Sequence, residues 1–162
     1  MQALERDSSH RRFDSPQALE AFGAQVAQAL GAGEAVCLFG PLGAGKSTLA
    51  RGLVRALTRP DQDVPSPTFT LMQTYQGPNF PLAHLDLYRL KRPEEAFEIG
   101  LDEALDVGAA VVEWSERLDG ALPPDRLDVR LEIADDGGRI ATLRGHGVWT
   151  GREHDLLRPA RD

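Results

Sequence analysis

The chain contains the nine-residue segment GPLGAGKST at positions 40–48, which leaves few folds open to it. The segment matches the pattern G-x-x-x-x-G-K-[ST] at every specified position. Its small residues let the backbone curl so that consecutive amides point inward at phosphate oxygens, and a following helix directs its positive end to the same place. Because the apolar run EAVCLF precedes the segment and a helical pattern follows it, we predict a strand, a phosphate-binding loop and a helix in succession.

The residues of this loop have distinct expected roles in binding ATP with Mg²⁺. Lys46 carries a mobile positive charge for the outer phosphates, and Ser47 supplies a hydroxyl oxygen to a Mg²⁺ ion that bridges two phosphates. Backbone amides provide the remaining contacts. The ATP-binding candidates of the loop are therefore Gly40, Leu42, Gly43, Ala44, Gly45, Lys46, Ser47 and Thr48.

Two helices are predicted around this loop, one before the preceding strand and one after the loop. The first begins near the sequence FDSPQALE, where Asp14 or Ser15 can cap the free amides and a proline suits the first turn. Apolar residues then recur at helical spacing until Gly31, which ends the helix. The second helix covers residues 46–57, where leucines four residues apart lie on one side.

The middle of the chain has the pattern of a β-hairpin followed by short helices and a further strand. The sequences VPSPTFTLMQTYQ and NFPLAHLDLY are rich in β-forming residues and are separated by turn residues, so they are able to pair. Short helices are expected in PEEAFEI and LDEAL. The continuous apolar run GAAVVEW is typical of a buried strand in a parallel sheet.

The last third of the chain alternates apolar and polar residues around the turn signal DDGG, which predicts an antiparallel hairpin at the sheet edge. Together the elements predict an α/β fold of the P-loop NTPase type, with a mixed β-sheet flanked by helices. We expect residues 13–147 to form this single domain and residues 1–12 to be flexible. The tail at 148–162 is expected to be disordered or to form a short helix held by Leu156 and Leu157.

The composition favours one cytoplasmic domain without membrane contact. Hydrophobic residues make up 41% of the chain and charged residues 27%, as in ordinary soluble proteins. Cys37, the only cysteine, cannot form an internal disulfide and fits a reducing compartment. We find no apolar stretch that would cross a bilayer and no signal-peptide pattern. The net charge of −7 argues against independent, non-specific nucleic-acid binding, although a local basic patch stays open.

Two carboxylates follow strand-like segments and are candidates for the metal side of the site. Asp86 closes PLAHLD and Glu113 closes GAAVVE, and a P-loop enzyme needs such a group to hold Mg²⁺ or its water shell. Either carboxylate is also able to cap a following turn. Thr68, in SPTFT, has the position of a loop hydroxyl that senses the outermost phosphate and its metal, with a strand-entry turn as the alternative.

Three further features have a structural interpretation beside a functional one. His84 shares a strand face with Asp86, so it supports the site or is satisfied by a neighbouring carbonyl. Trp114 is better interpreted as a packing residue than as a surface on which adenine stacks. The basic residues at 89–92 favour a solvated face, with contact to a partner or to tRNA as the alternative.

Four motifs occur in one order over roughly residues 13–145: GPLGAGKSTLARG, then SPTFTL, then HLDLYRL with PEEAFEIGL, then VVEWSERL. In this combination the chain resembles the TsaE family, the bacterial ATPases of tRNA threonylcarbamoyladenosine biosynthesis. The combination is far more specific than the phosphate loop alone, which many functions share. The resemblance implies a mixed sheet flanked by helices, binding of ATP and Mg²⁺, and work with two partner proteins, TsaB and TsaD.

The same resemblance implies roles for individual residues. Lys46 would hold phosphate, and Ser47 and Glu113 would bind Mg²⁺. Asp86 and Thr68 would complete the hydrolytic site. TsaD would place the threonylcarbamoyl group on the adenosine that follows the anticodon. The present chain would reach tRNA only indirectly, and its ATP hydrolysis would reset the complex.

The chain departs from the family pattern at two positions of the loop. Pro41 stands where the family usually has aspartate, and proline fixes its own dihedral and donates no amide, so the role of that aspartate is open here. Ser47 replaces threonine and keeps the hydroxyl that binds metal. The region 125–145 matches only loosely, and a nucleotide contact from Arg139 is an expectation there.

A domain with such a loop has three other possible functions: a GTPase, a small-molecule kinase or a binding module. A GTPase usually reads guanine through N-K-x-D, whereas the only asparagine here, Asn79, is followed by Phe80. A small-molecule kinase is the main alternative, because such a domain is able to transfer phosphate to an acceptor instead of water. A binding module without required turnover is the third. The absence of an obvious arginine finger predicts slow hydrolysis by the chain alone and completion of the site by a partner.

Overall fold

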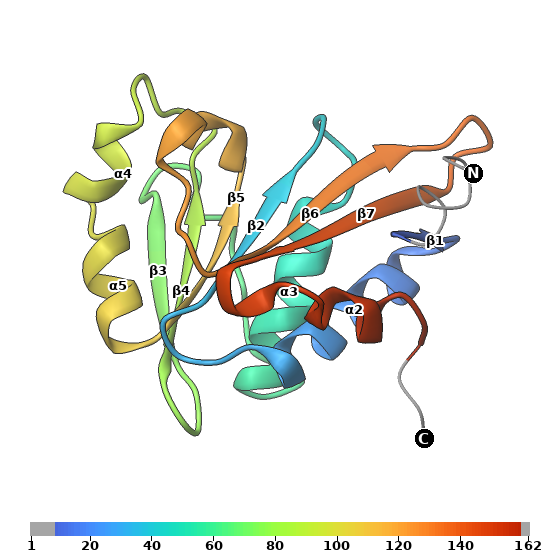
Figure 1. Ribbon diagram of the computed structural model, residues 1–162, viewed down its shortest axis with the longest axis horizontal. Coiled ribbons are helices and arrows are strands. Elements are labelled where there is room, and N and C mark those ends of the chain that lie inside the picture. The colour runs from blue at the N-terminus through green and yellow to red at the C-terminus, as the bar shows by residue number, and fades with distance from the viewer. Residues whose placement is uncertain (1–8, 160–162) are drawn as a thin grey trace.

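The computed structural model describes residues 9–159, which form one mixed β-sheet with helices on both faces (Figure 1). The strands are β1 (His10–Phe13), β2 (Ala35–Phe39), β3 (Met72–Gln76), β4 (Pro81–Asp86), β5 (Ala109–Glu113), β6 (Arg126–Ile133) and β7 (Arg139–His146). The α-helices are α2 (Pro16–Ala29), α3 (Lys46–Leu57), α4 (Glu94–Glu98) and α5 (Leu101–Val107). Three 3-10 helices are η1 (Ser115–Ala121), η2 (Gly147–Trp149) and η3 (Arg152–Leu156).

The sheet has the strand order β1-β7-β6-β2-β5-β4-β3. Its four central strands, β6, β2, β5 and β4, run parallel, while β3 on one side and β7 and β1 on the other are antiparallel to their neighbours. All five residues of β2 and all five of β5 are buried, as expected for strands covered on both faces. The mixed α/β sheet predicted from the sequence is confirmed.

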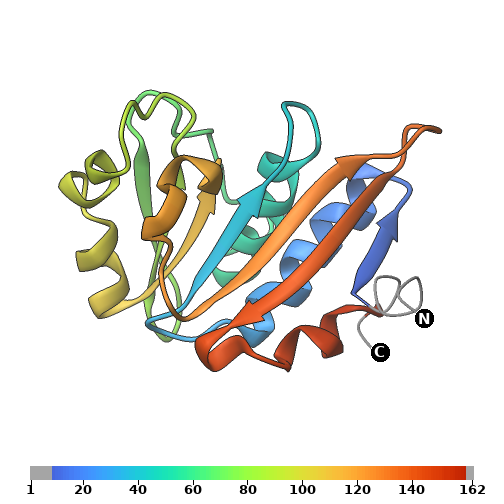
Figure 2. The same cartoon turned by 45° about the horizontal axis from the view of Figure 1, so that its top comes forward.

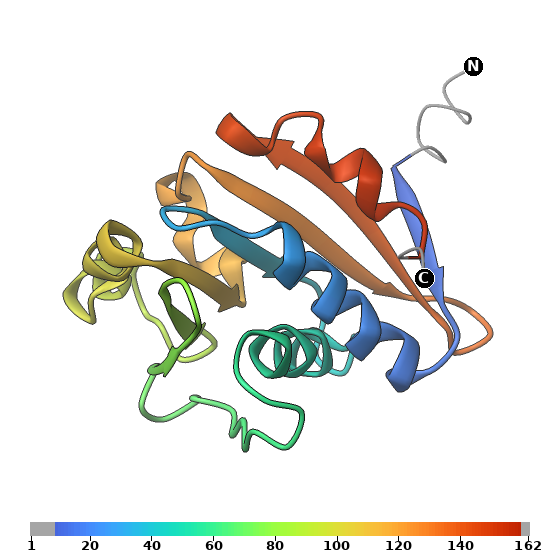
Figure 3. The same cartoon turned by 90° about the horizontal axis from the view of Figure 1, so that it is seen from below.

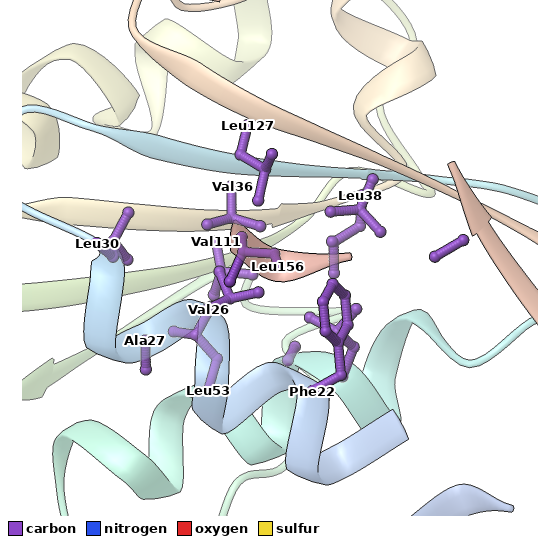
Figure 4. Close-up of a cluster of buried hydrophobic side chains, with 14 of the residues drawn as sticks. Phe22, Val26, Ala27, Leu30, Val36, Leu38, Leu53, Val111, Leu127 and Leu156 are labelled. Atoms are coloured by element: carbon purple, nitrogen blue, oxygen red, sulfur yellow. The ribbon is translucent and has the colours of Figure 1, made fainter. Parts of the chain in front are cut away.

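Helices α2 and α3 pack side by side on one face of the sheet, as the view from below shows (Figure 3). Figure 4 shows the core between them and the sheet, where Phe22 and Val26 of α2 meet Val36, Leu38 and other buried apolar side chains. A second core lies on the opposite face between α4, α5 and strands β4 and β5. The two cores hold the central parallel strands rigidly, and the phosphate loop follows one of those strands.

Local capping explains where the first helix begins. Of the two candidate caps, Ser15 is the one used: its hydroxyl oxygen accepts a hydrogen bond from the amide of Ala18 at 3.1 Å. Pro16 occupies the first helical position, where its missing amide is not needed. The helix ends at Ala29, just before the glycine that was predicted to stop it. Helix α3 covers the predicted residues 46–57.

Both predicted hairpins form, but the sheet edge differs from the expectation. β3 pairs with β4 and β6 pairs with β7, each antiparallel. Strand β6 also pairs with central β2, and the short strand β1 lies outside β7, so that β1 is the outer strand on this side (Figure 2). Residues 10–12, which were expected to be flexible, form β1 together with Phe13, while residues 1–8 lie outside the described range. Phe13 anchors β1, since its ring lies 4.9 Å from the ring of Phe22.

Residues 148–159 pack on the domain. Trp149 is buried and its indole nitrogen donates a hydrogen bond to Oε1 of Glu34 at 2.9 Å. Leu156 is buried in the core next to α2, at the end of the 3-10 helix η3. Residues 160–162 lie outside the described range. Among residues 9–159, we find no helix with the length and apolar character required to cross a membrane.

The Cys37 thiol is expected to be unreactive in the folded protein. Burial in the sheet, with a smaller contribution from Asp128, raises its pKa to about 12, and only the thiolate reacts with disulfide reagents. At pH 8 we expect an aromatic disulfide reagent to label the native protein no faster than it unfolds, and to label it at once in denaturant. Labelling of the native thiol at the rate of a free cysteine would contradict its placement within the sheet.

Candidate functional site

The turn between β2 and α3 is a closed loop that only glycine permits at two positions. Gly40 and Gly45 have φ values of 139° and 112°, which non-glycine residues rarely adopt. A Cβ atom at Gly40 would lie 2.4 Å from the carbonyl oxygen of Leu131, and one at Gly45 would lie 2.3 Å from a methyl group of Leu19. The loop therefore curls tightly against strand β6 and helix α2, and it leads directly into the first turn of α3.

The side chain of Lys46 folds back over the loop from the start of α3. Its ammonium nitrogen donates hydrogen bonds to the carbonyl oxygens of Gly40 at 2.6 Å and Pro41 at 3.0 Å. The same nitrogen lies 3.8 Å from the centre of the Trp114 ring, within the range of a cation–π contact. Burial lowers the pKa of Lys46 from its ordinary value, although the nearby carboxylates, Glu116 foremost, act in the opposite direction. The loop thus holds a largely desolvated cation.

Glu113 joins two predicted site residues at the end of β5. The hydroxyl of Ser47 donates a hydrogen bond to Oε1 of Glu113 at 2.8 Å. On the other side, Nε2 of His84 lies 2.6 Å from Oε2 of the same carboxylate, and both side chains are buried. Glu113 is therefore held from both sides with its Ser47 contact directed toward the phosphate loop.

The hydrogen bonding of His84 indicates its tautomer. Its second ring nitrogen, Nδ1, is buried and has no hydrogen-bond partner among residues 9–159. A bare N–H donor in that place would be more costly than a bare acceptor, so the arrangement favours a proton on Nε2 that is donated to Glu113. Of the two expectations for His84, the structure shows a contact with the site carboxylate and no contact with a carbonyl.

Asp86 gathers the hydroxyl groups of the loop before β3. Its Oδ2 accepts hydrogen bonds from the hydroxyls of Ser66 and Thr68, both at 3.1 Å, and these two hydroxyls lie 2.9 Å apart. Its Oδ1 accepts a hydrogen bond from the amide of Tyr88 at 3.0 Å. This carboxylate is thus a structural link between the Thr68 loop and the end of β4.

The two carboxylates meet because of the strand register. In the parallel pair of β4 and β5, Asp86 is the direct partner of Glu113. Both residues are at the carboxyl ends of their strands, and β2 ends at the phosphate loop on the same edge of the sheet. Ligands of open α/β sheets bind at this edge, so the register brings the metal candidates to the loop.

These side chains line one cavity of about 410 Å³ at the carboxyl edge of the sheet. Its lining consists of Leu42, Gly43, Gly45, Lys46, Ser47, Thr48, Ser66, Thr68, Asp86, Tyr88, Glu113 and Trp114. The polar groups that face it combine one cation with hydroxyl and carboxylate oxygens. No arginine from the described part of the chain lines this cavity.

Arg139 lies beside a second cavity, of about 180 Å³, on the other side of the loop. Its guanidinium donates a hydrogen bond to the carbonyl oxygen of Gly43 at 3.0 Å. The cavity is also lined by Gly45 and Thr48, which border the first cavity as well, by Phe13 at the end of β1 and by Pro16 at the start of α2. The structure thus brings Arg139 to the phosphate loop, from a strand 96 residues further along the chain.

Trp114 adopts a conformation that aims its ring at the loop. Its φ of 60° and ψ of 44° are in the left-handed region, which is unfavourable for a large aromatic residue. The ring lies tilted against that of Tyr88, at 4.9 Å between centroids, and contacts the Lys46 ammonium. Trp114 thus packs against Tyr88 and against the cation of the site, and it lines the cavity as well.

Sequence reasoning missed two groups that contact the site. Like Thr68, Ser66 donates a hydrogen bond to Asp86. The sequence could have indicated this contact, because Ser66 lies two residues before Thr68 in an SxT pattern. Glu116 accepts a hydrogen bond from the amide of Gly40 at 2.8 Å. That contact joins residues 76 positions apart, and no local pattern announces it.

The basic residues at 89–92 lie outside this cavity. The guanidinium of Arg89 stacks over the exposed ring of Phe69 at 4.6 Å. Arg92 forms an ion pair of 3.5 Å with Glu98, and both side chains are more than half exposed. A solvated face, as expected from the sequence, describes this cluster.

Comparison with known proteins gives a consistent result. The family model "Threonylcarbamoyl adenosine biosynthesis protein TsaE" matches residues 13–141. A protein of Rickettsia felis described as tRNA threonylcarbamoyladenosine biosynthesis protein TsaE is 41% identical over 118 residues, covering 73% of this chain and 69% of its own. A Bacillus subtilis protein of the same description is 35% identical over 139 residues, covering 84% and 85%. The crystal structure of B. subtilis YdiB superimposes with a TM-score of 0.74 at 29% identity, over 91% of this chain and 92% of that one.

Proposed function

The chain belongs to the TsaE family of threonylcarbamoyl adenosine biosynthesis proteins, and from this premise we propose that it binds ATP with Mg²⁺ and hydrolyses ATP in support of tRNA threonylcarbamoyladenosine formation. The observation that supports this most is the hydrogen bond between Ser47 and Glu113 beside the buried ammonium of Lys46. It joins a loop hydroxyl, a strand-end carboxylate and a cation at one cavity. A phosphate chain and a hard metal ion require this combination of groups.

In a complex with ATP, phosphate oxygens would replace the backbone carbonyls that Lys46 binds in this structure. Its ammonium group would leave the carbonyl oxygens of Gly40 and Pro41 for phosphate oxygens, which carry full negative charge and form stronger hydrogen bonds. Since burial weakens the hydration of this lysine, it is poised to exchange partners. The amides of the curled loop and the start of α3 would complete the phosphate contacts.

The groups beside Lys46 suit a Mg²⁺ ion that is bound partly by the protein and partly by phosphate and water. Ser47, Glu113 and Asp86 offer oxygen atoms, which this ion prefers. Among residues 9–159 there is no cluster of three or more His, Cys, Asp or Glu side chains suited to hold a metal. A bound Mg²⁺ would therefore also need phosphate and water oxygens, and it would supply charge neutralisation at the phosphates.

Water would attack the outermost phosphate in line with the bond that breaks. Asp86 or Glu113 would orient that water, and Lys46 with the loop amides would stabilise the charge that develops on the phosphate oxygens. The Thr68 hydroxyl donates a hydrogen bond to Asp86, so it would lie close to the outermost phosphate. Free phosphate and ADP would be the products.

The second cavity supports a place for the adenosine part of ATP. It borders Gly45 and Thr48 on the side of the loop opposite to Asp86 and Glu113. A nucleotide whose outer phosphates face those carboxylates would direct its base toward Phe13, Pro16 and Arg139. The apolar side chains would cover the base, and Arg139 would face its ribose or ring.

Partners would complete the site from outside. Three large apolar side chains near the mouth of the first cavity are exposed, with Leu42 at 78%, Phe69 at 81% and Tyr88 at 44% of their surface. Such a rim is suited to protein contact, and no arginine from residues 9–159 lines the cavity to stabilise the transition state. We propose that TsaB and TsaD counterparts cover this rim in the cytoplasm, with tRNA bound by the complex.

The decisive measurement is release of free phosphate from ATP by the purified chain, alone and with TsaB, TsaD and tRNA. We expect slow release by the chain alone and strong stimulation by the partners, because they complete the charge stabilisation. Lys46→Ala should remove the stimulated activity.

Transfer of the γ-phosphate to a small acceptor would favour the kinase alternative. Full activity without partners would contradict the partner-completed site. Stimulated release that persists in Lys46→Ala would mean that the activity belongs to another component.

A further inference from the structure

Strand β3 is an open edge of the sheet. It is the last strand in the order and pairs only with β4, beside helices α4 and α5 (Figure 1). The amide of Asp86 donates to the carbonyl of Leu71 at 3.1 Å, and in an antiparallel pair hydrogen-bonded residues alternate with residues that face away. The backbone groups of Gln73 and Tyr75 therefore form hydrogen bonds to β4, whereas those of the alternate residues point away from β4.

Those outward-facing residues are Met72, Thr74 and Gln76. Their backbone groups have no hydrogen bond to another loop or strand among residues 9–159. Unpaired amides and carbonyls in a row form a template for one further strand. Thr74 and Gln76 are also exposed residues.

The same three side chains line a groove between β3 and the helices α4 and α5. Its volume is about 540 Å³, larger than that of the cavity of about 410 Å³ beside Lys46. The apolar part of its lining consists of Met72, Pro81, Ala83, Phe97, Ile99, Ala104 and Val107. A strand added to β3 would project every second side chain toward this groove, because side chains alternate along a strand.

The rim of this groove is acidic. Residues 94–106 contain six carboxylates, and the whole stretch 94–116 contains no lysine, arginine or histidine. Two of the carboxylates, Glu98 and Glu103, line the groove itself, and Glu98 also forms the exposed ion pair with Arg92. An occupant with lysine or arginine side chains would complement this charge. A second copy of the chain would instead bring two acidic helix pairs together, and like charges oppose that arrangement.

We propose that β3 binds an extended, basic segment of a partner protein as an eighth strand of the sheet, with alternate apolar side chains of that segment in the groove. The backbone groups of Met72, Thr74 and Gln76 pair with the segment, and Glu98 and Glu103 bind its cations. The contact is at the sheet edge and does not depend on nucleotide hydrolysis. It is separate from the rim of Leu42, Phe69 and Tyr88.

The test uses a fluorescein-labelled octapeptide of alternating lysine and valine as the probe. We expect saturable binding in fluorescence anisotropy, and binding at least about tenfold weaker for the same peptide methylated at all its backbone nitrogens, because methylation removes the strand donors but keeps the side chains. The glutamate–valine peptide should not bind. In amide hydrogen exchange followed by NMR, the peptide should slow exchange at Met72, Thr74 and Gln76, with little change at Gln73 and Tyr75.

Two variants separate pairing from charge. Thr74→Pro removes one outward amide at an edge position where proline is tolerated, and the double variant Glu98→Lys/Glu103→Lys reverses the charge of the groove without altering the strand. Both should weaken binding at least about tenfold while the melting temperature of the double variant stays near that of the parent.

Three results would overturn the proposal. The first is no saturable binding of the lysine–valine peptide, and the second is equal binding of the methylated peptide. The third is exchange protection at Met72, Thr74 and Gln76 that rises with protein concentration without peptide, since the occupant would then be a second copy.

Discussion

Replacing Glu113 by glutamine is expected to lower partner-stimulated phosphate release by about 10²–10³-fold while ATP binding changes by less than about tenfold. The substitution removes the negative charge beside Ser47 but keeps the size of the side chain. Glutamate accepts from Ser47 on one oxygen and from His84 on the other, whereas glutamine has one acceptor only. The glutamine oxygen would keep accepting from His84, because the reversed tautomer would leave an unpaired N–H on the buried Nδ1. The Ser47 hydroxyl can rotate, so it would accept a hydrogen bond from the amide nitrogen instead.

Phosphate release at saturating ATP and Mg²⁺, with binding measured separately by calorimetry, checks this expectation. Glu132→Gln is the matched control, because it removes an exposed carboxylate of β6 that lies outside the cavity, and it should leave both quantities unchanged. If Glu113→Gln kept full phosphate release, the carboxylate would have no part in hydrolysis. If both variants and the parent showed binding but no release under any condition, the chain would be a binding module that holds a complex together.

Replacing Gly52 by alanine is expected to destabilise the fold by about 3 kcal/mol, although alanine is the better helix former by about 1 kcal/mol. Helices α2 and α3 cross at very close range here. A Cβ atom at Gly52 would lie 2.0 Å from the carbonyl oxygen of Glu20, and one at Gly23 of the facing helix would lie 2.2 Å from that of Leu49. Because both obstacles are backbone atoms, the helices must separate, and the core beneath them loses contact.

Thermal unfolding followed by circular dichroism measures this effect, which corresponds to a fall in the melting temperature of about 6–12 °C for a chain of this size. Gly120→Ala is the control, since an added Cβ there meets no atom within 4 Å, and it should change stability by less than about 0.5 kcal/mol. A Gly52→Ala variant as stable as the parent would show that the two helices do not pack as closely as described.

Sequence reasoning identified most of the elements and most of the residues that line the cavity of about 410 Å³, though not Ser66 or Tyr88. Helix α3 begins at Lys46 as predicted, because the loop pattern and the helical spacing of leucines point to the same boundary. Asp86 and Glu113 were placed at strand ends by their apolar runs, and the structure brings both to the cavity. Their proposed roles in metal binding and hydrolysis stay predictions, as does the proposed role of Thr68.

Other features escaped because their signals are weak or distant. Strand β1 has four residues, of which two are arginines, so it lacks the alternation that marks a strand, and its stability comes from pairing with β7 and burial of Phe13. The choice between Asp14 and Ser15 as cap depends on backbone geometry that both residues permit. The position of β6 beside β2, and not at the edge, depends on which strands find each other across 90 or so residues of chain.

Residue types and their spacing alone determined the loop of 40–48 and the helices around it, since local conformation requires particular residues at fixed intervals. The phosphate-binding and metal-binding roles of Lys46 and Ser47 stay predictions. The folded arrangement decided the rest: that His84 contacts Glu113, that Glu116 accepts from Gly40, and that Arg139 reaches Gly43. These contacts join residues far apart in the chain, and strand register and packing of whole layers set their distances. Neither strand register nor layer packing can be predicted from local sequence patterns.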